Sequence, residues 1–527
     1  MATSTDYYTS QIGGPTVINY VYTDMPWRLL AQDVYYFFVY LGALPRVMTP
    51  LRPCDSGELD ELYLGWANAW SLFVQLLVCA MQLCFVVALP IVVMLPVWAA
   101  VGAVAVFLAV NWALCRLLNG KGDVLHSDAK YAVQKPEHAH EQWIFLNGIA
   151  TGKHWLRNNV NRLALTFGRP VLGIHNRTSG MLLDVVECLI QRNFSYATGD
   201  VRLCFKLVRD FLYDAEKTKV VFILHSQGGI EGGLVLDWLL QELPQDLLSK
   251  LEIYTFGNAA NHFNNPHRHV LSQNLTQSNP KSALRTLVTE TSSLAEAEQG
   301  SDPDKTLESS SPDATSQDST RYIVPSRVLS AAKDRAIGHM EHYAHSTDFV
   351  AMWGVLHFAT NKMGSPNLPR FLGRLFKRST GRGGHLFNQH YLDGMFPLKR
   401  DAQTGALIGA DEDNEFMEET IRIGVENAAM DQSREALDVS YAGTRGLGAG
   451  AGSPEQVGTL TGGNRRRTRP EEKPKFKEVK VKELSRLWSY RNGRMPPDEP
   501  LAPPKQQDVA PPKKQDQGED KVSQEAT

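Results

Sequence analysis

The stretch Val220-Val221-Phe222-Ile223-Leu224-His225-Ser226-Gln227-Gly228-Gly229 decides the fold class of this chain. Its first five residues are apolar, which predicts a short buried strand. Apolar residues then recur at helical spacing, at Ile230, Leu234, Val235, Trp238 and Leu239. Ser226 is therefore expected at a turn that leads from a strand directly into a helix, a unit typical of parallel sheets with crossover helices.

A serine at such a turn is placed to act as a nucleophile. The sharp turn lifts the serine oxygen above the sheet and directs the helix N-terminus at a developing oxyanion. Leu224, however, stands where the motif Gly-x-Ser-x-Gly has its first glycine. We expect Leu224 to lie in a groove without side chains that Gly228 and Gly232 form on one helix face. The alternative is a serine that caps a helix in an inert domain.

The region 135–400 repeats the alternation of short apolar runs and helical patterns, which predicts one α/β domain with a mostly parallel sheet and flanking helices. The expected strands are Trp143–Leu146, Val171–Ile174, Val220–Leu224, Leu251–Phe256 and His339–Tyr343. The expected helices include Asn158–Phe167, Leu182–Gln191 and Val201–Tyr213. The polar segment 273–320 is poor in aromatic residues, which predicts a disordered insertion.

Residues 62–115 contain no charged residue and no histidine. One helix of that length would be about 80 Å long, whereas a bilayer core is about 30 Å thick. Because Pro90 and Pro96 lie near the middle, we expect a transmembrane hairpin over 66–120, after a polar and amphipathic segment 1–65. A single span beside a buried helix, or a buried helix pair, remains open. Basic residues flank the hairpin on both sides and predict that both flanks face the cytosol: Arg46, Arg52, Arg116 and Lys121.

The composition beyond residue 401 predicts a long disordered tail, 401–527. Within it, 464–492 combines Arg and Lys residues with spaced apolar residues, which predicts a basic amphipathic helix. Such a helix would dock on anionic lipid or on a protein partner, and the alternative is a solvated linker. The net charge of -3 gives no global attraction to nucleic acid. The six cysteines have no disulfide or metal-ligand spacing, which favours a reducing compartment.

Two further stretches complete a family pattern. Trp143–Leu146 is followed by Asn147-Gly148-Ile149-Ala150, and the stretch 341–350 places Asp348 after a strand. With these motifs the sequence resembles the α/β-hydrolase superfamily, in particular its lipase and serine-esterase branches, over about Trp143 to Phe396. It is also similar to a filamentous-fungal family of membrane-associated hydrolase-like proteins.

This resemblance implies a Ser-acid-His triad in that chain order. Ser226 would be the nucleophile, Asp348 the acid, and His385 on a Gly-rich loop the base, with His390 as the alternative. His357 lies in an apolar helical pattern and is expected in the core. The backbone N–H groups of Ile149 and Gln227 would form the oxyanion hole. No cofactor and no metal is expected, and His262, His267 and His269 are expected in a polar loop.

The expected function is that of a membrane-anchored serine hydrolase that acts on an ester or thioester by an acyl-enzyme mechanism. The resemblance to lipases and the membrane hairpin imply a lipid-like substrate. We expect integral placement in an endomembrane such as the endoplasmic reticulum, with the domain in the cytosol. The alternative is a catalytically inactive scaffold that uses the same fold to recruit partners.

Overall fold

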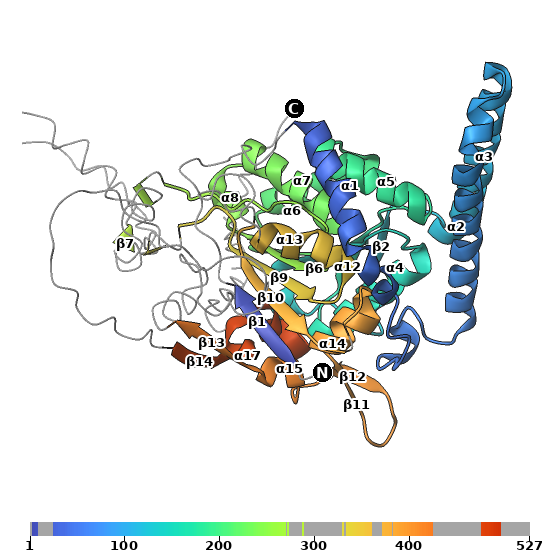
Figure 1. Cartoon of the computed structure of the whole chain (residues 1–527). Helices are drawn as coiled ribbons and strands as arrows, with labels where there is room; N and C mark the ends of the chain where they lie inside the picture. Colours follow the sequence, from blue (N-terminus) through green and yellow to red (C-terminus); the bar gives the residue numbers. More distant parts are fainter. Residues whose placement is uncertain are drawn as a thin grey trace, which may run out of the picture.

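The computed structural model describes residues 3–8, 25–269, 271–272, 287–288, 329–330, 334–360, 371–381, 383–424 and 476–496. At its centre is an eight-stranded sheet in the order β1-β10-β9-β6-β5-β3-β4-β2 (Figure 1). Strands β10 to β4 in this order are parallel, and β1 and β2 pair antiparallel at the edges. The bounds are β1 Ser4–Tyr8, β2 Val124–His126, β3 Glu141–Leu146, β4 Val171–Ile174, β5 Lys219–His225, β6 Leu251–Phe256, β9 His339–His345 and β10 Arg374–Ser379. The prediction of an α/β fold with a mostly parallel sheet is confirmed.

All five expected strands are present, and β4 and β6 have the expected bounds. Strand β10 was not predicted because its sequence is rich in basic residues, yet it is almost fully buried. Its Lys377 forms an ion pair with Asp6 of β1, with 3.0 Å between Nζ and Oδ2. Strand β1 therefore neutralises the charge of Lys377, which would otherwise be costly to bury in the sheet.

Alternate side chains along the strands enter two hydrophobic cores, one on each face of the sheet. In β3, Ile144 and Leu146 lie in one core and Trp143 and Phe145 in the other. Helices α5 (Met181–Phe194), α6 (Gly199–Tyr213) and α7 (Gln227–Glu242) contribute to the first core. Helix α4 (Lys153–Phe167) and a short π-helix, η5 (Phe387–Leu392), contribute to the second. The predicted helices are thus present, each a few residues longer than expected.

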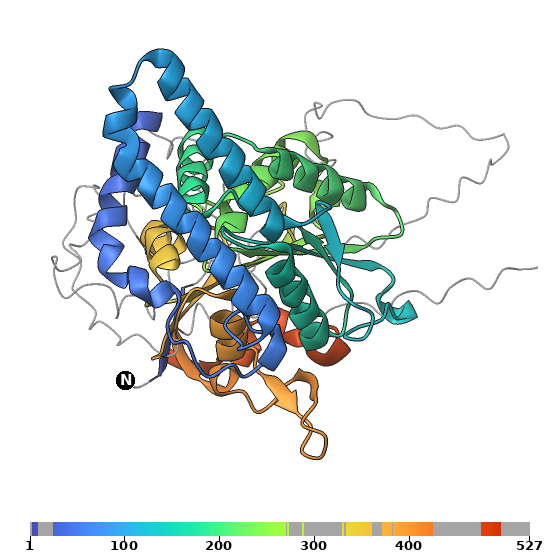
Figure 2. The ribbon, with the colours of Figure 1, turned by 90° about the vertical axis from the view of Figure 1, so that its right-hand side faces the viewer.

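The apolar stretch forms two helices, α2 (Trp66–Val93) and α3 (Val97–Asn119), each long and apolar enough to cross a membrane. They form a hairpin that lies along the side of the α/β domain and projects beyond it (Figures 1 and 2). Polar side chains hold it to the loop before α5, because Gln82 and Asn111 both donate to the Ser179 carbonyl at 2.8 Å. Asn119 donates to the Thr178 carbonyl at 2.8 Å.

The segment 1–65, expected to be polar and amphipathic, packs with the α/β domain where the structure describes it. β1 extends the sheet, and α1 (Pro26–Tyr40) packs on α5 and on α12 (Phe349–Trp353). Asp33 and Arg192 form a buried ion pair between α1 and α5. Because parts of one sheet flank the hairpin in the sequence, both of its ends must lie on the same side of any membrane that it enters.

The prediction of a disordered tail from residue 401 was wrong for 401–424 and 476–496. β13 (Thr420–Gly424) pairs with β14 (Phe476–Lys480), and α17 (Val481–Leu484) and η7 (Leu487–Gly493) follow. No long amphipathic helix forms over 476–492, because Val479, Leu484, Leu487 and Trp488 are buried in the second core. Residues 425–475 and 497–527, and the predicted insertion 273–320 apart from β7 (Leu287–Val288), lie outside the described residues.

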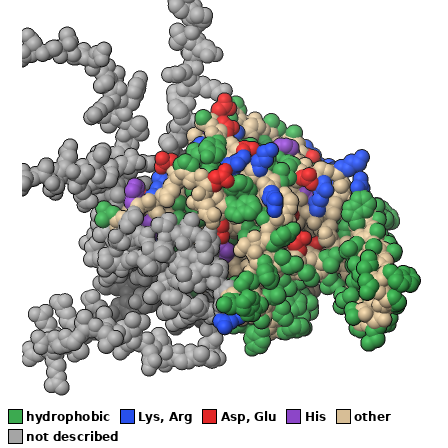
Figure 3. Space-filling model, turned by 90° about the horizontal axis from the view of Figure 1, so that it is seen from above, with side chains coloured by type: hydrophobic (Ala, Val, Ile, Leu, Met, Phe, Trp, Pro, Cys, Tyr) green, Lys and Arg blue, Asp and Glu red, His purple; other side chains and the backbone are tan. Residues whose placement is uncertain are grey.

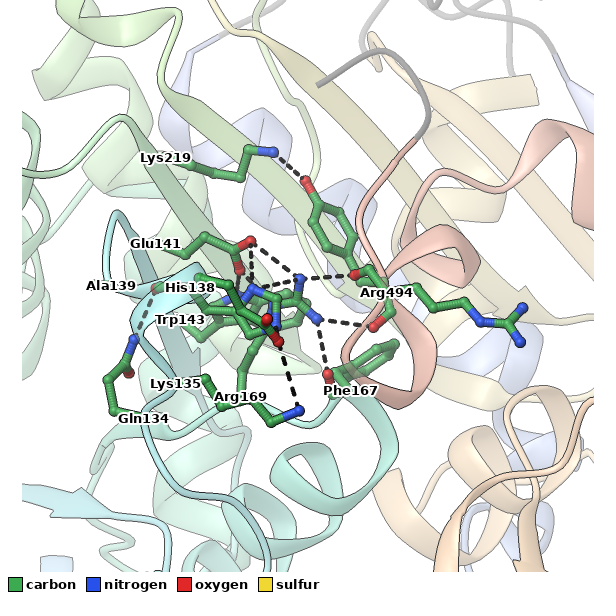
Figure 4. A network of polar contacts seen from close by, with 12 residues as sticks. Gln134, Lys135, His138, Ala139, Glu141, Trp143, Phe167, Arg169, Lys219 and Arg494 are labelled. Atoms are coloured by element: carbon green, nitrogen blue, oxygen red, sulfur yellow. Dashed lines mark hydrogen bonds and ion pairs between the residues drawn. The ribbon is translucent and has the colours of Figure 1, made fainter. Parts of the chain in front are cut away.

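The C-terminal segment 476–494 packs across the amino ends of the strands. Arg169 is buried there between the carboxylate of Glu141 and two carbonyls of this segment, those of Tyr490 and Arg494, at 3.0 and 2.7 Å (Figure 4). A cavity of about 150 Å³ lies beside this network, lined by residues that include Glu141 and Arg169. Since Glu141 begins β3, this cavity is at the opposite edge of the sheet from Ser226.

Candidate active site

Ser226 lies at the turn between β5 and α7, as the sequence predicts. Its backbone has φ 58° and ψ −122°, a strained conformation for a residue with a side chain. The loop after β3 approaches so closely that a Cβ added to Gly148 would lie 2.4 Å from the Cβ of Ser226. The strained turn and the glycine together leave the serine oxygen at the carboxyl end of the sheet.

Three strand ends bring Ser226, His385 and Asp348 into one hydrogen-bonded row. His385 Nε2 lies 2.9 Å from Ser226 Oγ, and His385 Nδ1 lies 2.9 Å from Asp348 Oδ2. The serine follows β5, the acid follows β9 and the histidine follows β10, and parallel strands end at one edge. Neutral His385 with its proton on Nδ1 can donate to Asp348 and accept the proton of Ser226.

Asp348 is held as a carboxylate by several donors. It is fully buried, and burial alone would raise its pKa. Interaction with His385, together with hydrogen bonds from the Tyr391 hydroxyl at 2.6 Å and the Val350 N–H at 2.9 Å, holds the pKa of Asp348 below its usual value. The carboxylate is therefore available to orient His385 and to stabilise its imidazolium form.

Asp348 and His385 are held in position by two residues that the sequence did not indicate. Tyr391 lies on η5, six positions after His385, and donates to Asp348. His225 stacks on His385 with ring centroids 4.8 Å apart, and its Nε2 lies 2.8 Å from the His385 carbonyl. Burial lowers the pKa of His225 to about 3, so it is a neutral donor to that carbonyl. The position of His225 directly before Ser226 was the one available signal.

The structure separates the candidate histidines. His390 does not contact Ser226, because its Nδ1 accepts from the Leu386 N–H at 3.0 Å and its Nε2 lies 2.9 Å from the Pro50 carbonyl. His357 is buried in α13 (Val355–Thr360) against Tyr36 and Tyr40 of α1. In the loop after β6, His262 pairs with Asp237, and His269 pairs with Asp334.

The expected oxyanion donors lie on either side of Ser226. Gln227 is the first residue of α7, and Ile149 follows Gly148 in the loop that touches the serine. Within the described part of the chain, neither backbone N–H donates a hydrogen bond to another residue. Both N–H groups are therefore available to a carbonyl oxygen bound at the serine.

The loop that carries Ile149 is held by two elements. Ala150 has a positive φ of 54°, and its N–H donates to the buried Asp184 of α5 at 2.9 Å. Gln75 of α2 donates to the Ala150 carbonyl at 2.7 Å. The hairpin therefore directly contacts the loop that carries Ile149. The sequence did not indicate this contact.

Leu224 lies against the helix that follows the serine turn, α7 (below, the elbow helix), at Gly232, as expected, since a Cβ added to Gly232 would be 2.4 Å from Leu224 Cδ1. Gly228 serves another contact than the one expected. A Cβ at Gly228 would lie 2.5 Å from the Leu146 carbonyl oxygen, at the end of β3. The groove for Leu224 is therefore formed at Gly232, while Gly228 lets the helix pass the neighbouring strand.

The site is nearly closed. The exposed fractions of Ser226, His385 and Asp348 are 2%, 6% and 0%. The segment after α1 covers the histidine, because the His385 N–H donates to the Val47 carbonyl at 3.1 Å.

Comparison with protein-family models, with curated proteins and with solved structures finds no match for this chain.

Proposed function

We propose that this chain is a membrane-anchored serine hydrolase of the α/β-hydrolase fold, related to lipases and serine esterases and to the filamentous-fungal family that its sequence resembles. The observation that carries the proposal is the hydrogen-bonded row Ser226–His385–Asp348, with the serine on a strained strand-to-helix turn. Serine, acid and histidine also follow one another along the chain in the order of that superfamily.

The reaction is acyl transfer from an ester or thioester. Ser226 Oγ attacks the carbonyl carbon while its proton passes to His385 Nε2, and the oxyanion is stabilised by the N–H groups of Ile149 and Gln227. The bond to the leaving alcohol or thiol then breaks, and that group takes the proton from His385. Water repeats the sequence on the acyl-enzyme, which releases the acid and restores Ser226.

The substrate is lipid-like. Support comes from the apolar hairpin, which contacts the loop of Ile149, and from exposed apolar side chains on α1, among them Trp27, Tyr35 and Phe38. Figure 3 shows hydrophobic side chains gathered over the hairpin and over a neighbouring part of the surface. An apolar surface of this kind favours contact with a bilayer, which would hold the site next to acyl chains. The basic residues beside the hairpin favour a domain on the cytosolic side of the membrane, and the membrane in this proposal is an endomembrane.

The closed site favours a second candidate function, that of an inactive scaffold. Labelling of the full chain in lipid vesicles with a small fluorophosphonate probe separates the two. A hydrolase is labelled, loses the label in Ser226→Ala, and keeps it in Ser249→Ala, an exposed serine remote from the site. Asp348→Asn should lower kcat for ester hydrolysis by about 10⁴-fold. A folded parent that is never labelled would establish the scaffold instead.

A further inference from the structure

Three carboxylates from three different helices converge behind the elbow helix. Glu187 lies on α5, Asp200 on α6 and Glu231 on α7, and one oxygen from each lies within 4.8 Å of the others. Glu231 is completely buried, while Glu187 and Asp200 are partly exposed. The group therefore has a buried end and an end that solvent can reach.

These acids have no counter-charge among the residues that the structure describes, and burial raises the pKa of both Glu187 and Glu231. Within the described residues, no Lys, Arg or His forms an ion pair with any of the three acids. The Gln191 amide lies 3.2 Å from an oxygen of Glu187 and 3.2 Å from Glu231 Oε1, but an amide carries no charge. Glu231 Oε2 is fully buried and accepts no hydrogen bond from the part of the chain that the structure describes. A buried carboxylate oxygen without a donor, beside two further carboxylates, has the environment of a metal ligand.

We propose that Glu187, Asp200 and Glu231 bind a divalent cation, with Ca²⁺ as the best fit. All three ligands are hard oxygen donors, which favour Ca²⁺ and Mg²⁺ over softer metals. Oxygens that share a Ca²⁺ ion at about 2.3–2.6 Å lie at most about 5 Å from one another, as these do. Water reaching the exposed end can complete the six to eight ligands that Ca²⁺ takes, whereas Mg²⁺ requires a stricter octahedron.

The cation would fix the helices around the elbow. Gln227 Nε2 donates to Glu187 Oε1 at 3.3 Å and to Gln191 Oε1 at 3.0 Å, so the first turn of α7 is connected to the three acids. Binding of the ion would join α5, α6 and α7 through charged ligands, in addition to the uncharged hydrogen bonds of Gln191 and Gln227. The cation site does not depend on the proposed hydrolase activity, and its test needs no substrate.

The experiment is a calcium titration of the full chain in detergent after removal of metal with a chelator. Ca²⁺ should raise the melting temperature by about 3 °C or more at 100 times its dissociation constant, because it binds the folded state alone. Mg²⁺ should act more weakly. The matched control is Asp210→Asn, an acid on the same helix as Asp200 that pairs with Arg209 at the surface. It should respond to Ca²⁺ like the parent.

Asp200→Asn and Glu231→Gln should lose the response to Ca²⁺. In chelator alone, Asp200→Asn should melt no lower than the parent, because it removes like-charge repulsion, and this variant tests the site even if Glu231→Gln fails to fold. Isothermal titration with Ca²⁺ should give one site in the parent and none in Asp200→Asn. A parent that shows neither a melting shift nor heat of binding up to millimolar Ca²⁺ would overturn the proposal, as would an unchanged response in Asp200→Asn.

Discussion

Ser226 combines a strained backbone with a hydrogen bond to His385, with 2.9 Å between Oγ and Nε2, and neighbouring residues that take no part in that bond maintain this arrangement. Tyr391 and Val350 donate to Asp348, and His225 donates to the carbonyl of His385. These contacts keep His385 in one orientation at a site where a misplacement of about 1 Å costs orders of magnitude in rate.

Tyr391→Phe removes one donor from Asp348 and leaves His385 and Val350 in place. We expect turnover to fall by about 3- to 30-fold, since a hydrogen bond to a charged group contributes about 1.5–3 kcal/mol and part of it is compensated. The Tyr391 hydrogen bond lowers the pKa of Asp348, so its loss raises that pKa and activity should disappear at a higher pH on the acid side. The measurement is the pH dependence of kcat/KM. Tyr213→Phe, at an exposed tyrosine, should leave the profile unchanged.

Gly232→Ala tests the groove that accepts Leu224. From the sequence a mild effect is expected, but the added Cβ would lie within 2.8 Å of both methyl groups of the buried Leu224. We now expect a loss of about 1–3 kcal/mol through overpacking, and Gly232→Leu should lose more. Gly233→Ala is the matched control, because the nearest atom would be 3.5 Å away. Addition of Leu224→Ala should rescue Gly232→Ala in a double-mutant cycle, and strictly additive effects would contradict the contact.

At the scale of elements, the C-terminal segment 476–494 supplies partners to acids at the amino ends of the sheet. Arg486 Nε lies 2.9 Å from Glu252 Oε1, and the backbone N–H groups of Arg486 and Leu487 donate to Glu341 at 2.6 and 3.2 Å. Although burial opposes ionisation, the charges of Arg486, Lys219 and His339 hold the pKa of Glu252 far below its usual value. The domain therefore depends on a segment that follows it by many residues.

Arg486→Met should lower the free energy of unfolding by about 3–5 kcal/mol, because it leaves a buried carboxylate without its main partner. Glu252→Gln in the same chain should restore much of the loss. Arg209→Met removes an exposed pair with Glu242 and should cost less than about 1 kcal/mol. Thermal or urea unfolding in detergent measures all three. Equal losses in the two arginine variants would contradict a structural role for the C-terminal segment.

At the scale of the whole molecule, the chain on both sides of the hairpin belongs to one folded unit. Epitope tags can be inserted ahead of α1 and at 402–405, in the loop between β11 (Leu398–Arg400) and β12 (Leu407–Ala410). A protease added to intact vesicles should cleave both tags or neither. The chain should also resist alkaline extraction, because the domain covers little of the apolar surface of the hairpin and leaves it to enter a bilayer. Protection of only one tag would show that the hairpin crosses the membrane once.

A buried acid cluster connects the segment before the hairpin to the domain. Burial, Asp393 and Glu61 raise the pKa of Asp60 to about 10, so the folded chain keeps a proton that the unfolded chain releases near pH 4. The free energy of unfolding should fall as the pH rises between these values, by up to about 1.4 kcal/mol per pH unit. Melting temperatures from pH 6 to 9 should show this slope. Asp60→Asn should flatten it and the exposed Asp246→Asn should not, and a parent without a slope would contradict the assignment.

The sequence by itself determined the features that depend on neighbouring residues. Apolar runs of four to six residues predicted the inner strands, helical spacing predicted α4 to α6, and the uncharged stretch predicted two apolar helices. The turn at Ser226 was readable because a strand, a serine and a glycine-rich helix follow one another directly.

Only the tertiary structure decided the contacts between residues far apart in the chain. The choice between His385 and His390 depended on which ring the strand ends and the loop at Pro50 bring to Ser226. Strand β10 was not predicted, and 464–492 was expected to be a basic amphipathic helix, because the charges of these segments have no partner nearby in the sequence. Their partners, Asp6 and Glu252, lie hundreds of residues away, and a buried charge is stable only where the fold places its counter-charge beside it.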